Sequence, residues 1–110
     1  MLYFANPTGK ATLAAMREGR LGCITTPSQG NRRPAGVKWC ADNGRFGRGW
    51  PGYDAWWQWL VARAGDADSC VFAVAPDVVG DAIATLVDAA PWLPRIRAIG
   101  FPSALVAQDG

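Results

Sequence analysis

Short apolar runs alternate with helix-like segments along this chain, and this alternation constrains the fold more than any other feature. The clearest apolar run is Cys70–Ala75, which is followed by Pro76. A run without polar positions is typical of a strand that is covered on both faces. Strands that alternate with helices form βα units and a parallel sheet. The sequence therefore predicts an α/β fold.

The same patterns predict about five mainly parallel strands with helical crossovers. We expect the strands at residues 2–5, 21–26, 37–41, 70–75 and 103–107. We expect the helices at residues 8–18, 53–64, 81–90 and 91–99, with Thr8 as the first N-cap. The connections are long enough for right-handed crossovers. An open doubly wound sheet and part of a (β/α)8 barrel both fit this pattern.

Composition limits the chemistry that such a chain can perform. Its 110 residues suffice for one domain, expected over residues 1–110. It contains no histidine, which excludes Ser-His-Asp triads, Cys-His pairs and most zinc sites. Its three cysteines are widely spaced and lie in apolar runs, so we expect buried, reduced thiols. We therefore expect no metal site and no cofactor.

The sequence also predicts a cytoplasmic protein without membrane contact. No apolar run reaches the roughly 18 residues that a membrane span needs. The first residues, Met1-Leu2-Tyr3-Phe4, lack the basic start and long apolar stretch of a signal peptide.

Polar residues follow three of the expected strands. Asp42-Asn43-Gly44 follows the third, Pro76-Asp77 the fourth and Gln108-Asp109-Gly110 the last, while Asp81 lies one helical turn after Asp77. Functional groups in parallel α/β folds gather at the carboxyl ends of strands. Carboxylates and an amide together suit a purine-like base, because they supply both acceptors and donors. The alternative for each Asp is a helix N-cap or a turn.

These segments resemble a known enzyme family in order and in strand context. Ala41-Asp42-Asn43-Gly44-Arg45-Phe46 resembles the Ser-Asp-Ser-Gly-Gly-Phe segment of the tRNA-guanine and DNA-guanine transglycosylases. Val74–Asp77 resembles their strand that ends in a base-recognising Asp, and Leu105–Gly110 their Val-Gln-Gly-Gly segment. The likeness is greatest to the phage and bacterial branch that places a 7-deazaguanine in DNA. It implies the N-terminal portion of a TIM-type (β/α)8 barrel.

The resemblance also implies roles for individual residues. Asp42 would be the catalytic acid–base or base-orienting carboxylate, and Asp77 would bind the Watson–Crick edge of the purine. Gln108 would contact the carbonyl of the base. The other expected base contacts are Asn43, Phe46 and Gly110, although Phe46 could instead be a core aromatic.

The nucleophilic Asp of the family lies on a strand that has no counterpart in this sequence. The resemblance thus implies a complementary C-terminal half, or self-association through open sheet edges. Expected partners are a purine or 7-deazaguanine base and nucleic acid, with DNA favoured over tRNA. If the gene is phage-encoded, the compartment would be the host cytoplasm.

Arginines flank the Asp42 segment, and tryptophans cluster after it. Arg32, Arg33, Arg45 and Arg48 could contact a nucleic-acid backbone, or could belong to a solvated loop. The tryptophans Trp50, Trp56, Trp57 and Trp59 could stack on bases. For Trp56, Trp57 and Trp59, together with Leu60, packing of a helix against the core is favoured.

Two other functions stay open at this stage. One is a non-catalytic module that binds a nucleobase or nucleotide in the same place. The other is a small nucleoside-transferring enzyme that uses a carboxylate such as Asp77 or Asp81 as its nucleophile.

Overall fold

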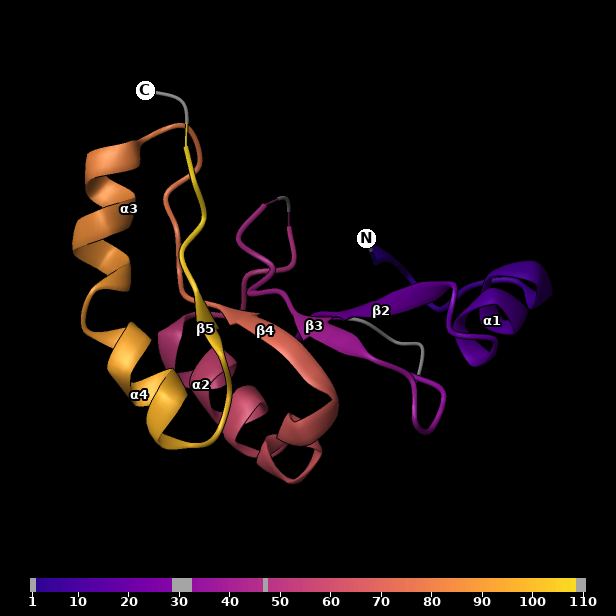
Figure 1. The fold of residues 1–110 in the computed structure, drawn as a ribbon. Coiled ribbons are helices and arrows are strands. Elements are labelled where there is room, and N and C mark those ends of the chain that lie inside the picture. The colour runs from indigo at the N-terminus through magenta and orange to yellow at the C-terminus, as the bar shows by residue number, and fades with distance from the viewer. Residues whose placement is uncertain (1, 29–32, 47, 109–110) are drawn as a thin grey trace.

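The computed structural model describes residues 2–28, 33–46 and 48–108 (Figure 1). Within this part of the chain, one sheet contains five parallel strands: β1 (Tyr3–Ala5), β2 (Leu21–Thr25), β3 (Trp39–Ala41), β4 (Cys70–Val74) and β5 (Ser103–Ala104). The helices of this part are α1 (Lys10–Arg17), α2 (Tyr53–Val61), the 3-10 helix η1 (Ala64–Ser69), α3 (Ala82–Ala89) and α4 (Trp92–Ala98). The predicted α/β class with five parallel strands is confirmed. Helices lie on the connections β1–β2, β3–β4 and β4–β5, whereas the described residues between β2 and β3 form none.

The strands lie in the sheet in their order along the chain, β1-β2-β3-β4-β5. A doubly wound sheet needs a point at which this order reverses. Between β1 and β5 there is none, so the doubly wound alternative is wrong. The outer edges of β1 and β5 carry no partner strand from the described residues.

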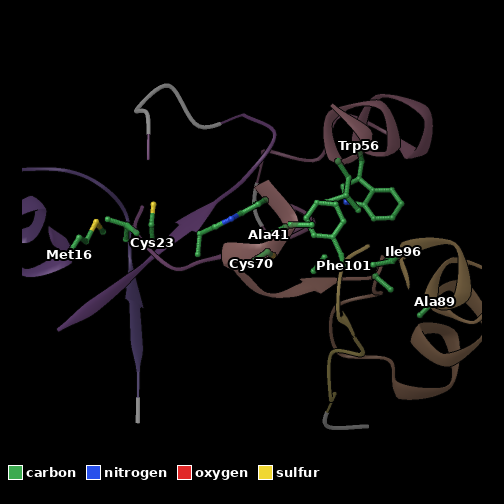
Figure 2. Packing of buried hydrophobic residues seen from close by; sticks show 14 residues of the cluster. Met16, Cys23, Ala41, Trp56, Cys70, Ala89, Ile96 and Phe101 are labelled. Carbon is green, nitrogen blue, oxygen red and sulfur yellow. The ribbon is translucent and has the colours of Figure 1, made fainter. Parts of the chain in front are cut away.

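The main core lies on one face of the sheet and includes side chains from all four α-helices. Met16 of α1, Trp56 of α2, Ala89 of α3 and Ile96 of α4 belong to one buried cluster. The sheet contributes Cys23, Trp39, Ala41, Cys70 and Ala73 to it. Figure 2 shows that the cluster extends along the sheet, from Met16 at one end to Ala89 at the other. The four α-helices therefore pack on the same side of the strands.

The face of the sheet opposite this core is concave. The ring of Phe4 on β1 lies 5.6 Å from that of Phe72 on β4, although two strands separate them. Strands in a flat sheet are about 4.8 Å apart, so β1 and β4 would be roughly 14 Å apart. The Phe4 ring lies over Gly22 of β2, where an added Cβ would be 2.6 Å from it. The contact between the two rings therefore requires a curved sheet with Phe4 and Phe72 on its concave face.

Element boundaries differ from the prediction at several ends. The first helix begins at Lys10, and its N-cap is Gly9 at φ 77° instead of Thr8. This backbone conformation favours glycine, which has no side chain to form a cap hydrogen bond. The 3-10 helix after α2 was not expected, and β5 is shorter than predicted.

The expectations for cysteine and tryptophan hold. All three cysteines are free and buried. Trp56 is 1% exposed, while Trp50, Trp57 and Trp59 pack against the core. The described residues include no helix that is both long and apolar enough to cross a membrane.

Candidate functional site

The segments that follow β3, β4 and β5 leave the sheet on the same side, as Figure 1 shows. They carry Asn43, Asp77 and Gln108, and the first two are buried with exposures of 2% and 6%. Gln108 is half-buried. The strands are parallel, so their carboxyl ends meet at one edge and bring these distant residues together.

A chain of hydrogen bonds links the three side chains. Asn43 Nδ2 donates to Asp77 Oδ1 at 2.8 Å, and Gln108 Nε2 donates to Asp77 Oδ2 at 3.0 Å. The backbone N–H of Gly80 donates to Gln108 Oε1 at 2.9 Å. The Asp77 carboxylate is thus held between two amides, one from each neighbouring segment.

Two further contacts fix the turns that carry these side chains. Gly44 has φ 78°, and a Cβ there would lie 2.9 Å from the carbonyl oxygen of Gly49. The turn after Asn43 therefore needs glycine at this position. After β4, the buried Thr85 hydroxyl accepts from Val78 N at 2.9 Å and donates to Val78 O at 3.0 Å. This pair of bonds ties the Asp77 segment to α3.

Asp42 lies half-buried beside this chain of hydrogen bonds. Burial is the main cause that raises the pKa of its carboxyl above the ordinary value of 3.8. Backbone hydrogen bonds from Gly44 and Asn43 act in the opposite direction, and the charge of Asp77 raises the pKa further. A carboxyl with a raised pKa is a candidate proton donor.

Arg45 connects the site to α3. Its backbone N–H donates to Asn43 Oδ1 at 2.8 Å, and its guanidinium forms an ion pair of 3.1 Å with Asp88. Tyr53 donates to the other oxygen of Asp88 at 2.6 Å. The guanidinium also lies over the ring of Trp50, 4.8 Å from its centroid. Sequence reasoning missed Asp88 and Tyr53, which no motif connects with residues 42–45.

The other predicted site residues are placed differently. Phe46 is 84% exposed, so the core alternative for this residue is wrong. Arg33 forms a 3.2 Å ion pair with Asp66, whereas Arg48 is exposed. Asp81 Oδ1 accepts from Ala84 N at 2.9 Å, which makes it the N-cap of α3. Arg32, Asp109 and Gly110 lie outside the described residues.

The arrangement combines hydrogen-bond donors and acceptors at one edge of the sheet. Asp77 offers acceptors, Gln108 offers a donor and an acceptor, and Asp42 offers an exchangeable proton. Over residues 2–28, 33–46 and 48–108, no group of three or more Cys, Asp or Glu side chains is placed to hold a metal ion.

Comparison of the chain with protein-family models, with curated proteins and with solved structures finds no match. The function must therefore be argued from the site.

Proposed function

We propose that this chain is part of a base-exchanging transglycosylase that replaces guanine in DNA by a 7-deazaguanine. The observation that carries the proposal is the contact of Asn43, Asp77 and Gln108 at adjacent strand ends. These residues lie in the three ordered segments that resemble motifs of guanine transglycosylases. Their direct contact supports treating them as one site.

A guanine-type base fits this site in its hydrogen-bonding pattern. The N1–H and the 2-amino group of the base would donate to the Asp77 carboxylate. In the structure, the amide of Gln108 donates to Asp77 Oδ2. On binding, the base would replace this amide, which would turn to donate to the 6-oxo group. Recognition would thus exchange one hydrogen bond of Asp77 for bonds to the base.

Asp42 would supply the proton in this proposal. Exchange breaks the glycosidic bond of the leaving guanine and forms a new one to the incoming base. The leaving base needs a proton as its ring nitrogen takes up the bonding electrons. A half-buried carboxyl with a raised pKa holds that proton closer to neutral pH than an exposed Asp does.

The fold supports a place in a (β/α)8 barrel. The sequential strand order, the α-helices on one face and the curved sheet agree with such a barrel. A closed barrel has eight strands, and β1 and β5 present open edges for the others. We propose that further βα units, in a complementary half or another copy, complete the barrel and supply the nucleophilic carboxylate.

The proposed nucleic-acid contact depends mainly on Arg48. Arg33 and Arg45 already form ion pairs with Asp66 and Asp88, whereas Arg48 is exposed near the site loop. A phosphate would have to replace an internal partner of the first two, but could approach Arg48 directly.

A non-catalytic base-binding module is the second candidate. It is favoured by the lack of a free nucleophile among the carboxylates of the site, because Asp42 would transfer the proton and Asp77 would bind the base. Asp81 caps α3, so none of these three is left as an evident nucleophile.

An exchange assay tests whether the chain binds the base and whether it exchanges bases without a second half. Radiolabelled guanine is incubated with the chain, with and without double-stranded DNA. We expect binding of the base without incorporation into DNA by the chain alone. Incorporation by the chain alone would support the transglycosylase activity and would show that no second half is needed. Absence of any binding would contradict the proposed function.

A further inference from the structure

Both polar atoms of the Asn43 side chain form hydrogen bonds inside the protein. It is 2% exposed. Its amide nitrogen donates to Ala75 O at 2.8 Å and to Asp77 Oδ1 at 2.8 Å. Its oxygen accepts from Arg45 N at 2.8 Å. An Asn side chain has two N–H donors, and both are used, so none remains for a ligand.

We propose that Asn43 is a positioning residue that acts on the base through Asp77, without touching the base. This inference rests on the proposed function, because it assigns a task to one residue of that site. It replaces the sequence-based expectation that Asn43 contacts the base directly.

The geometry explains how Asn43 would perform this task. Ala75 and Asp77 lie two residues apart on the segment that follows β4, and the Asn43 amide binds both. One bond anchors the amide to the backbone, and the other fixes the direction of Asp77 Oδ1. Asp77 Oδ2, which meets the half-buried Gln108, is left as the oxygen nearer to a ligand. Asn43 would therefore orient the carboxylate toward a base edge.

Arg45 and Asp88 hold Asn43 itself in place. The Arg45 backbone binds Asn43 Oδ1, and the Arg45 guanidinium is paired with Asp88. The side chains of that pair are each only 20% exposed. Asn43 is thus fixed from the α3 side as well as from β4, as an orienting residue must be.

This role predicts a particular form of selectivity. An oriented carboxylate accepts two neighbouring N–H groups better than one. Asn43 should therefore favour 7-deazaguanine over 7-deazahypoxanthine, which lacks the 2-amino group. Loss of Asn43 should reduce this preference, because an Asp77 carboxylate without a fixed orientation gains less from the second N–H group of 7-deazaguanine.

A double-mutant cycle tests whether Asn43 acts through Asp77. Calorimetry measures 7-deazaguanine affinity in the wild type, Asn43→Asp, Asp77→Asn and the double variant. Asn43→Asp keeps the size and the acceptor for Arg45 but removes the donor to Asp77. We expect about tenfold weaker binding from Asn43→Asp in the wild-type background and no further loss when Asp77 is already changed. An equal loss in both backgrounds would show direct contact and overturn the inference.

Two additional measurements cover other outcomes. If thermal melting shows that Asn43→Asp does not fold, Asn43→Ser replaces it in the same cycle. In the ligand-free wild type, NMR measures proton exchange of the Asn43 side-chain amide. We expect Asp77→Ala to accelerate that exchange about tenfold through loss of one acceptor. Unchanged exchange overturns the positioning role, whereas absence of base binding with accelerated exchange contradicts only the proposed function.

Discussion

Gln108 Nε2 lies 3.0 Å from Asp77 Oδ2, although 31 positions separate the two residues. Gln108 follows the edge strand β5, and Asp77 follows its neighbour β4. The bond between them joins the end of β5 to the more buried segments of the candidate site.

Replacing Gln108 by Glu should weaken base binding. The variant loses the donor to Asp77 Oδ2 and brings two carboxylates together, while its size is unchanged. We expect 7-deazaguanine affinity to fall about tenfold or more, since like charges in contact cost free energy and the donor to the 6-oxo group is lost. Calorimetry measures the change, and Gln58→Glu on the exposed side of α2 is the matched control. Equal affinity in the two variants would remove Gln108 from the site.

Asp42 should make stability depend on pH. The folded-state pKa is raised, so the ionised carboxylate destabilises the fold above that pKa. Below the ordinary value of 3.8 both folded and unfolded chains are protonated, and the penalty disappears. Asn at this position keeps the acceptor for the backbone N–H groups without the charge. We therefore expect Asp42→Asn to raise the melting temperature by a few degrees at pH 7.

Melting curves recorded at several pH values check this expectation. The gain should shrink as the pH falls and be absent below 3.8. The exposed Asp68→Asn serves as control and should show no such gain. If Asp42→Asn still raised the melting temperature below pH 3.8, the burial of a charge would not be the cause.

The buried thiols should be inert in the folded chain. Burial raises the pKa of Cys40 to about 12 and that of Cys70 to about 11. At pH 8 the reactive thiolate of Cys40 is therefore present in roughly one molecule in ten thousand. Ellman's reagent should label neither thiol in native buffer, and all three cysteines in guanidinium chloride. Rapid labelling of the native chain would show that β3 and β4 are accessible.

Gly22→Ala tests the curvature of the sheet. The new Cβ would lie 2.6 Å from the Phe4 ring, which must then leave its position against Phe72. We expect a loss of about 1–3 kcal/mol in the free energy of unfolding, measured by urea denaturation. In a Phe4→Leu background the same substitution should cost less, because the smaller side chain can move aside. Equal costs in both backgrounds would mean that the ring is not the obstacle.

Much of the fold could be predicted from local pattern. The run from Cys70 to Val74 is apolar throughout, and β4 lies at these residues. The ends of the helices were harder to predict. The backbone conformation of Gly9 sets the start of α1, and glycine has no polar side chain that would mark this position in the sequence. The strand order could not be read from periodicity, since hydrophobic spacing shows which residues are buried and not which strands are neighbours.

The candidate site was predictable only in part. Parallel strands bring their ends together, so Asp77 and Gln108 could be grouped from the sequence. The partners of Arg45 could not, because Asp88 lies 43 positions away on a helix without a motif. The burial of Asn43 also depends on tertiary contacts, and these are the contacts on which the proposed positioning role rests.

Calorimetric titration with 7-deazaguanine tests whether Asp77 belongs to a base-recognition site. The wild-type chain is compared with Asp77→Asn, which keeps the size of the side chain but loses the acceptor pair, and with the exposed Asp68→Asn. We predict saturable binding by the wild type and Asp68→Asn, and affinity at least about tenfold lower for Asp77→Asn. Equal affinity of all three proteins, or no binding by the wild type, would contradict a base-recognition site at Asp77.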